Sequence, residues 1–348
     1  MKKLKIYLAN IWDELLSERG LVMLEKKYII GGNWLTGARN YKLKSYNPNL
    51  LIYAPSKTKG SLNLSISILK QLPTIMWALF PDYILGWDFL KKDFLFKISP
   101  RLIKQFSYCR CLLSNSLYTK KLLERALPNK FKFINCYLGI DIRGILLEKI
   151  NESKNRIFLP QSVNILWNHM WKIDKNFLGA LKIIKFLAPK YKNVGFYMGR
   201  KESWGESDYS PSCLKKEYIK FCDWMKKYPL NNIFFVESMP YRTYWGFISQ
   251  MDIAFSVSYH ESFGISILEQ AATGLACIIP NELVYKEIFK SYKGLVSRKR
   301  IQSSIELVLK NSKMRAILQQ SAPIYAKRFK IEHTINQLSK IINIILNS

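Results

Sequence analysis

The segment Ser258-Tyr-His-Glu-Ser-Phe-Gly-Ile-Ser-Ile-Leu-Glu-Gln-Ala-Ala-Thr-Gly274 decides the fold class of this chain. It follows the apolar run 253–257, which predicts a buried strand, and its second half has the apolar spacing of a helix. Gly274 is well placed to end that helix in the left-handed conformation. A strand, a short loop and a helix in this order predict a β-α unit. The loop of such a unit lies at the carboxyl edge of a parallel sheet, where ligands bind.

The same alternation of apolar runs and amphipathic stretches continues in both directions from this unit. It predicts an α/β fold with two Rossmann-like domains, each built on a parallel sheet. We expect a first domain over 1–155, a second over 156–320, and a C-terminal helix over 321–348 that packs back on the first domain. The expected strands are 4–9, 51–54, 74–78, 111–114 and 133–137, then 163–167, 194–198, 233–236, 253–257 and 276–279. The expected helices of the second half are 176–187, 212–227, 241–250 and 263–273, followed by a helical tail over 303–346.

The chain is strongly basic. It has 348 residues, with 54 Lys and Arg against 25 Asp and Glu, so its formal net charge is +29. Such an excess favours an anionic partner: a nucleic acid, an acidic membrane surface or a phosphorylated substrate. Coding bias toward Lys, Ile and Asn is the alternative explanation, because lysines decorate solvated faces readily.

Targeting signals and metal-ligand spacings are absent from the sequence. No apolar run reaches the ~18 residues that a membrane span needs, and the basic start Met-Lys-Lys-Leu-Lys lacks the apolar core and cleavage site of a signal peptide. We therefore expect a cytoplasmic protein, with peripheral association at the inner face of the membrane left open. Six cysteines without a Cys-x-x-Cys pair, beside only three histidines, predict buried free thiols and no metal site.

Two carboxylates and a glycine give the opening segment its chemistry. Glu261 lies just before the predicted helix and Glu269 about two turns inside it, and eight residues of helix rise by roughly 12 Å. That separation is comparable to the distance from the hexose to the ribose of a nucleotide sugar, and ionised carboxylates make strong hydrogen bonds to hydroxyl groups. The backbone amides of Ser262, Phe263 and Gly264 would point outward at the positive end of the helix dipole, which favours a phosphate.

The Glu-x₇-Glu pattern with Phe-Gly inside it resembles the donor site of retaining glycosyltransferases of family 4, which have the two-domain GT-B fold. The resemblance implies that Glu261 contacts the transferred sugar and Glu269 the ribose. Family members carry Arg and then Lys, five residues apart, after the first strand of the second domain, and both cations hold the donor diphosphate. Lys175 matches the lysine, whereas Met170 stands at the arginine position.

Other side chains could complete that donor site. Lys172 and Arg200 are candidates to replace the missing arginine, although a lysine cannot reproduce its bidentate geometry. His169 directly follows the first strand of the second half, and His260 precedes Glu261, so both are candidate donor-binding residues. For His260, a structural loop histidine whose hydrogen bonds are made within the protein is an equally good interpretation.

A narrower resemblance covers roughly residues 163–289. The sequences Trp-Asn-His-x-Trp-x-x-Asp-Lys-Asn at 167–176, Tyr-His-Glu-x-Phe-Gly and Pro-Asn-Glu-Leu-Val-Tyr-Lys-Glu at 280–287 are similar to tRNA-queuosine mannosyltransferase-like proteins. The first half departs from the family, because no histidine precedes His169 and the usual first-domain active-site histidine is absent.

The resemblance implies a hexosyltransferase that acts with retention of configuration and takes a nucleotide sugar as co-substrate, without a cofactor or metal. In this interpretation Glu261 and Lys175 act on the reacting groups. We expect bacterial surface glycan or glycolipid assembly, with a glycan or lipid-linked acceptor at an anionic membrane surface. One alternative is a GDP-mannose-dependent enzyme acting on tRNA. A non-catalytic protein that binds nucleotide sugars or anions is the alternative of another class, favoured by Met170 and the missing histidine.

Overall fold

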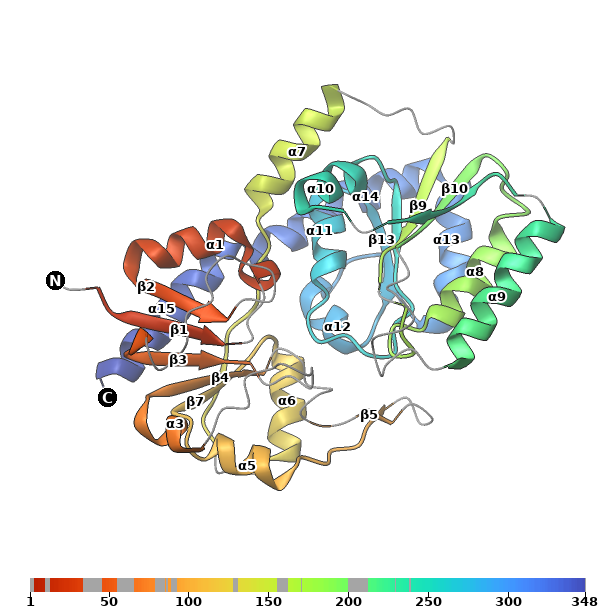
Figure 1. The fold of residues 1–348 in the computed structure, drawn as a ribbon. Coiled ribbons are helices and arrows are strands. Elements are labelled where there is room, and N and C mark those ends of the chain that lie inside the picture. The colour runs from red at the N-terminus through yellow and green to blue at the C-terminus, as the bar shows by residue number, and fades with distance from the viewer. Residues whose placement is uncertain are drawn as a thin grey trace. The chain divides into compact units, whose positions relative to one another are not determined.

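In the computed structural model the chain divides into two units, each built around a parallel sheet (Figure 1). Unit 1 contains Met1–Asp141 and Phe329–Ser348, and unit 2 contains Ile142–Arg328. The structure describes residues 3–9, 13–33, 46–54, 66–78, 85, 87–88, 93–127, 131–154, 162–169, 171–199, 212–228, 230–237 and 239–347.

Unit 1 has a six-stranded sheet in the order β2-β1-β3-β4-β7-β8, all parallel. The strands are β1 (Lys5–Ala9), β2 (Ile29–Asn33), β3 (Leu50–Tyr53), β4 (Thr74–Ala78), β7 (Cys111–Ser114) and β8 (Phe133–Asn135). A short antiparallel pair joins β5 (Trp87–Asp88) to β6 (Asp93–Phe94). The helices are α1 (Asp13–Lys27), α3 (Ile66–Gln71), α5 (Pro100–Phe106), α6 (Leu117–Ala126) and α15 (Ile331–Asn347).

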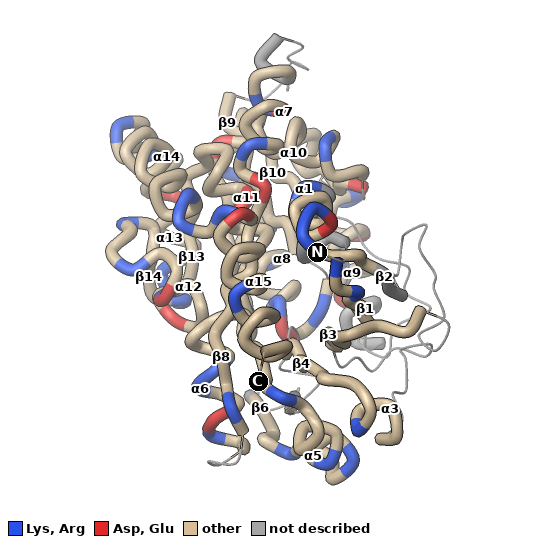
Figure 2. The backbone as a smooth tube through the Cα atoms, turned by 90° about the vertical axis from the view of Figure 1, so that its left-hand side faces the viewer, with Lys and Arg blue, Asp and Glu red and all other residues tan. Residues whose placement is uncertain are grey.

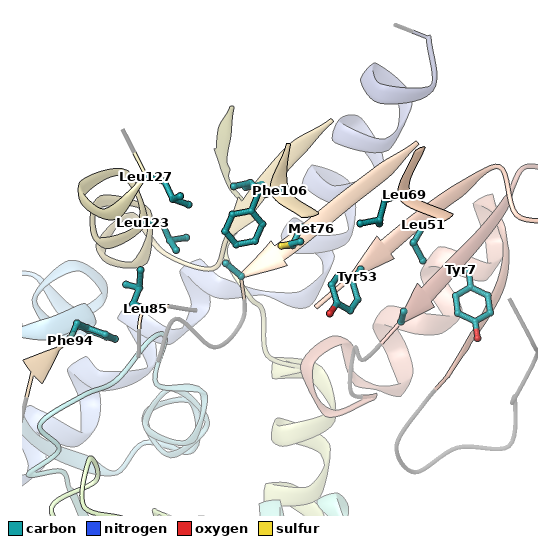
Figure 3. Packing of buried hydrophobic residues seen from close by; sticks show 13 residues of the cluster. Tyr7, Leu51, Tyr53, Leu69, Met76, Leu85, Phe94, Phe106, Leu123 and Leu127 are labelled. Atoms are coloured by element: carbon teal, nitrogen blue, oxygen red, sulfur yellow. The ribbon is translucent and has the colours of Figure 1, made fainter. Parts of the chain in front are cut away.

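Side chains from four strands of that sheet and from the helices beside it form the core of unit 1. Tyr7, Leu51 and Met76 point from consecutive strands into one buried cluster, and Phe106 and Leu123 close it from α5 and α6 (Figure 3). Continuous apolar strands such as β3 and β4 are buried along their whole length, as expected for parallel strands covered on both faces.

Unit 2 has the strand order β11-β10-β9-β12-β13-β14, again all parallel. The strands are β9 (Val163–Trp167), β10 (Val194–Gly199), β11 (Ile233–Val236), β12 (Ile253–Phe255), β13 (Ala276–Pro280) and β14 (Leu295–Val296). The α-helices are α7 (Ile142–Lys154), α8 (Phe177–Leu187), α9 (Ser212–Lys227), α10 (Tyr241–Ser249), α11 (Ile265–Thr273), α12 (Leu283–Phe289), α13 (Ile301–Lys310) and α14 (Ser312–Ala326). Short 3₁₀ turns lie at Arg298–Arg300 and Lys327–Phe329. In chain order this sheet reads 3-2-1-4-5-6, the order of dinucleotide-binding Rossmann folds.

The α/β fold class with two parallel sheets is confirmed, and the ten strands expected from the sequence are all present, some with shifted ends. Four strands were missed: β2, which contains Gly31 and Gly32, the short pair β5 and β6, and the two-residue β14. Their apolar runs are too short or too rich in glycine to stand out by pattern. The predicted tail helix is in fact three helices, interrupted at Asn311 and between Ala326 and Ile331.

The units divide between Asp141 and Ile142, whereas the boundary expected from the sequence lies at residue 155. The difference is α7, which lies with unit 2 because it packs against α10 and α11. The end of the chain lies with unit 1, where α15 packs beside α1 (Figure 1). The Tyr28 hydroxyl donates to the Asn343 side chain there, over 3.1 Å.

Candidate functional site

The carboxyl ends of β9 and β12 define the position of the candidate site. These two strands are neighbours in the sheet, and they lie where the strand order changes direction. A parallel sheet opens a crevice at such a switch point, because the two connections leave in opposite directions. The loop after β9 (168–176) and the loop after β12 (256–264) therefore emerge side by side, and they carry most of the predicted site residues.

Backbone and amide hydrogen bonds hold the two loops together. Asn176 caps α8 by accepting from the Gly179 amide over 3.1 Å, and its Nδ2 donates to the Val257 carbonyl over 2.9 Å. The Asp174 carbonyl accepts from two consecutive amides of the other loop, Tyr259 at 2.7 Å and His260 at 3.0 Å. The side chains of the two loops are thereby fixed relative to one another before any ligand arrives.

The start of α11 is shaped by Gly264, which has a φ of 80°. The predicted helix start at residue 263 is wrong by two positions: Gly264 precedes the helix in the left-handed region, and α11 begins at Ile265. A Cβ added to Gly264 would lie 2.9 Å from Cε1 of Tyr285, a fully buried side chain. At the other end of the helix, Gly274 has a φ of 93°, which confirms its expected left-handed conformation.

Lys175 is the centre of a partly enclosed ionic cluster. Its Nζ donates to Oε2 of Glu261 and to the His260 carbonyl, each at 3.1 Å, and it lies 3.6 Å from Oδ2 of Asp174. The Lys175 and Glu261 side chains are only 13% and 12% exposed. An ion pair with so little solvent contact is screened weakly, so its strength depends on both partners being charged.

Glu261 remains ionised at neutral pH. Burial by itself would raise the pKa of this carboxyl, but the charge of Lys175, together with His169 and His260, outweighs burial and lowers the pKa. The side chain is therefore an acceptor only, with two oxygens available to hydroxyl donors in addition to its bond from Lys175.

The two histidines beside Glu261 are neutral. The pKa of His169 is lowered to about 4 and that of His260 to about 3, in both cases mainly by burial. The charge of Lys175 also lowers both pKa values, whereas Glu261 acts in the opposite direction. Nδ1 of His169 lies 4.0 Å from Oε2 of Glu261. Its Nε2 is buried and has no hydrogen-bond partner within the described residues.

Glu269 lies on α11, on the side that faces α10. Its carboxylate is buried, and its Oε1 accepts a hydrogen bond from Nε1 of Trp245 over 3.0 Å. A carboxylate has about four lone-pair positions, and the indole bond uses one of them. The tryptophan was not predicted, because nothing in the sequence near residue 245 indicates which helix it faces.

A partly buried polar network at the end of β9 was also missed. Nδ2 of Asn168 donates to the Tyr244 hydroxyl over 2.8 Å, and the Ser266 hydroxyl donates to the Asn168 carbonyl over 2.9 Å. Nε2 of Gln270 donates in turn to Ser266 over 2.9 Å. The i, i+4 spacing of Ser266 and Gln270 was the one available signal. The network joins the end of β9 to α10 and α11, so it fixes the loop that carries His169.

The remaining predicted site residues differ in how far they are exposed, and two of them are not described by the structure. Ser262 is partly exposed in the loop before α11, whereas the Phe263 side chain is fully buried in the core, so only its backbone is available to a ligand. Lys172 lies in the same loop as Lys175 and is partly buried. Met170 and Arg200 lie outside the described residues.

Neither a metal-ligand cluster nor a membrane-spanning helix occurs in the residues that the structure describes. Those residues contain no group of three or more His, Cys, Asp or Glu that could hold a metal ion. Their helices include none that is long and apolar enough to cross a membrane.

One protein family model matches part of the chain. Residues 214–324, which include both glutamates, match the family model of glycosyl transferases group 1. No curated protein matches the sequence.

Solved structures resemble the whole chain. Sucrose-phosphate synthase from Thermosynechococcus elongatus has a TM-score of 0.74 at 12% identity, covering 99% of this chain and 100% of that one. HepE from Anabaena, solved in complex with UDP and glucose, has a TM-score of 0.69 at 12% identity, covering 98% and 100%. WaaG, a glycosyltransferase involved in lipopolysaccharide biosynthesis, has a TM-score of 0.64 at 11% identity, covering 97% and 99%.

The fold is therefore that of the GT-B glycosyltransferases. The part of the chain that matches the family model, residues 214–324, lies in unit 2 and includes both glutamates.

Proposed function

We propose that this protein is a retaining glycosyltransferase that moves a hexose from a nucleotide sugar to an acceptor, with its donor site at the carboxyl ends of β9 and β12. The observation that carries the proposal is the enclosed pair of Glu261 and Lys175 beside the start of α11. The GT-B fold and the glycosyl transferases group 1 match support the same chemistry.

Glu261 has the properties that recognition of a sugar requires. It is ionised at neutral pH, held by Lys175, and flanked by two neutral histidines. A fixed carboxylate accepts hydrogen bonds from two adjacent hydroxyl groups, which orients the ring of the transferred hexose. His169 can bond a hydroxyl group through Nε2 without adding a charge.

The leaving group of this reaction is a nucleoside diphosphate, so negative charge develops on the diphosphate as the glycosidic bond breaks. Lys175 and the backbone amides of 262–264 would stabilise that charge. Lys175 also compensates the carboxylate of Glu261, which would otherwise repel the diphosphate. Glu269, in the middle of α11, would accept hydrogen bonds from the ribose.

The acceptor is proposed to be a glycan or a lipid-linked saccharide. HepE, one of the structurally similar proteins, was solved with UDP and glucose, and WaaG takes part in lipopolysaccharide biosynthesis. No metal is part of the proposal, because Lys175 and the amides of 262–264 can supply the positive charge that a diphosphate needs.

Thermal unfolding against a panel of nucleotide sugars, without added metal, tests the donor site. A donor at ~100 times its Kd adds about 2.7 kcal/mol of stability. We expect one donor to stabilise the protein selectively, and Glu269→Ala to abolish that effect. Glu217→Ala is the matched control, because it removes an exposed glutamate from α9.

Turnover separates an enzyme from a binding protein. Release of the free nucleotide in the presence of acceptor is expected for the wild type and is expected to fall at least a hundredfold in Glu261→Gln, a loss of ~2.7 kcal/mol in the transition state. Donor binding without turnover would identify a non-catalytic nucleotide-sugar protein. Selective stabilisation by GDP-mannose would direct the acceptor search to tRNA, and the absence of any donor effect would refute the proposal.

A further inference from the structure

Lysines and arginines are spread over elements of both units, whereas acidic residues are few (Figure 2). One surface of unit 2 is nevertheless unusual. Helices α8 and α9 pack side by side, and we call the exposed side chains of 182–192 and 216–228 the α8–α9 face (Figure 1). It contains eight exposed lysines, Lys182, Lys185, Lys190, Lys192, Lys216, Lys220, Lys226 and Lys227.

The charge of this face is strongly positive. Its two acidic residues, Glu217 and Asp223, are each paired with a lysine, at 2.7 Å to Lys220 and 3.7 Å to Lys226. Eight lysines less two carboxylates leave a net charge of +6. A surface of this kind attracts an anionic partner at the distance of a Debye length, ~10 Å at 0.1 M salt.

Large apolar side chains are exposed among the same lysines. Phe186 is 41% exposed, Ile219 is 49% and Tyr228 is 51%. They come from both helices, so the apolar surface belongs to the face and not to one irregular turn. Exposed aromatic and aliphatic side chains gathered in a charged surface mark a region of interaction.

The lysines and the rings are arranged in pairs. Nζ of Lys190 lies 3.5 Å from the ring centre of Phe186, Lys185 lies over Trp224 at 5.2 Å, and Lys227 lies over Tyr228 at 5.9 Å. In such a pair the aliphatic stem of the lysine covers apolar surface and the ammonium remains at its edge. This arrangement suits the boundary between acyl chains and phosphate head groups.

The same arrangement is poorly suited to a nucleic acid. Residues 177–192 and 212–228 contain no arginine, the side chain that binds phosphate groups in bidentate fashion and stacks on bases. Stacking of bases requires open aromatic faces, whereas the rings of Phe186, Trp224 and Tyr228 already have lysines over them.

We propose that the α8–α9 face docks unit 2 onto an anionic phospholipid bilayer. The lysines contact the phosphate head groups, and Phe186, Ile219 and Tyr228 enter the interfacial region. This inference does not rest on the proposed transferase activity, because it concerns other residues of the unit. If both hold, docking would bring the donor site to a membrane-bound acceptor.

Sedimentation of the full chain with vesicles tests the proposal. The vesicles contain phosphatidylcholine alone or phosphatidylcholine mixed with phosphatidylglycerol. Each well-placed lysine contributes about fivefold to partitioning onto an anionic surface. We expect binding to the anionic vesicles only, and the triple variant Lys182→Gln/Lys185→Gln/Lys216→Gln is expected to bind roughly 100-fold more weakly.

A second triple variant controls for overall charge. Lys293→Gln/Lys299→Gln/Lys313→Gln removes three exposed lysines elsewhere in unit 2 and is expected to bind like the wild type. For the apolar contribution, Phe186→Ser/Ile219→Ser should weaken binding, whereas Ile317→Ser/Ile324→Ser, also exposed, should not.

Three outcomes overturn the proposal. The first is that the wild type does not bind anionic vesicles, and the second is that both triple lysine variants lose vesicle binding equally. The third is that the protein binds tRNA but not vesicles, and that the first triple lysine variant no longer binds tRNA. The last outcome would assign the face to RNA. Donor-induced stabilisation, measured on the same variants without vesicles, should be unchanged, so failure of docking and failure of the donor site are distinguishable.

Discussion

Replacing Lys175 by methionine would test whether the positive charge of Lys175 stabilises the enclosed carboxylate of Glu261. The change keeps the length and apolar stem of the side chain but removes the contacts of Nζ to Glu261 and the His260 carbonyl at 3.1 Å and to Asp174 at 3.6 Å. It leaves the Glu261 carboxylate enclosed without its cation. Breaking a buried ion pair in this way costs ~3–5 kcal/mol, and the 12% exposure of Glu261 places the expected loss near the lower end.

The pH dependence of that loss has a definite sign. In the wild type the pKa of Glu261 is lowered, so its contribution to stability is present above the unfolded pKa and is lost as the pH falls through the folded pKa. Without Lys175, burial raises the pKa, and the carboxyl then takes up a proton as the medium is acidified. The difference in stability between variant and wild type should therefore be largest near neutral pH and should shrink toward about pH 4.

Urea unfolding of four proteins measures the coupling between the two side chains: the wild type, Lys175→Met, Glu261→Gln and the double variant. Because Glu261→Gln removes the charge that Lys175 compensates, the double variant should be more stable than the sum of the single changes predicts, by ~1–3 kcal/mol. Additive effects of the two changes, or a loss for Lys175→Met that does not vary with pH, would refute the reasoning.

Three further predictions concern single positions. Gly264→Ala should lower the free energy of unfolding by ~1–3 kcal/mol, measured by urea denaturation, because its φ of 80° is strained for alanine and the new Cβ would press on Tyr285. The pKa of His169 is lowered to about 4, mainly by burial, so the unfolded chain takes up the proton before the folded chain does. The free energy of unfolding of the wild type should therefore fall by up to ~3 kcal/mol between about pH 6.5 and pH 4. Thermal unfolding of His169→Phe should show a smaller fall over that range. Lys149→Met should cost ~1–2 kcal/mol in the same assay, because Nζ of Lys149 donates to the Thr273 carbonyl at the negative end of α11 over 2.6 Å; an unchanged midpoint would show that this bond contributes nothing.

Long apolar strands were predictable because parallel strands are buried on both faces and therefore appear as uninterrupted apolar runs. The strands Thr74–Ala78, Cys111–Ser114, Val163–Trp167 and Ile233–Val236 have the predicted ends. The backbone conformation at single residues was also predictable from the sequence, as the left-handed conformation of Gly274 illustrates. The errors occurred where the hydrophobic pattern of the sequence is weak: at β2, at the two-residue strands β5, β6 and β14, and at the first turn of α11.

The sequence by itself determined the α/β fold class, the position of the β12–α11 loop, and the candidate residues Glu261, Glu269 and Lys175. These depend on spacing along the chain, which folding does not change. Only the tertiary structure decided that Lys175 neutralises Glu261, that Trp245 holds Glu269, and that α7 belongs to unit 2. Each of these contacts joins segments that are distant in sequence, so the burial and the charge that set their strength exist only after the sheet has brought the strand ends together.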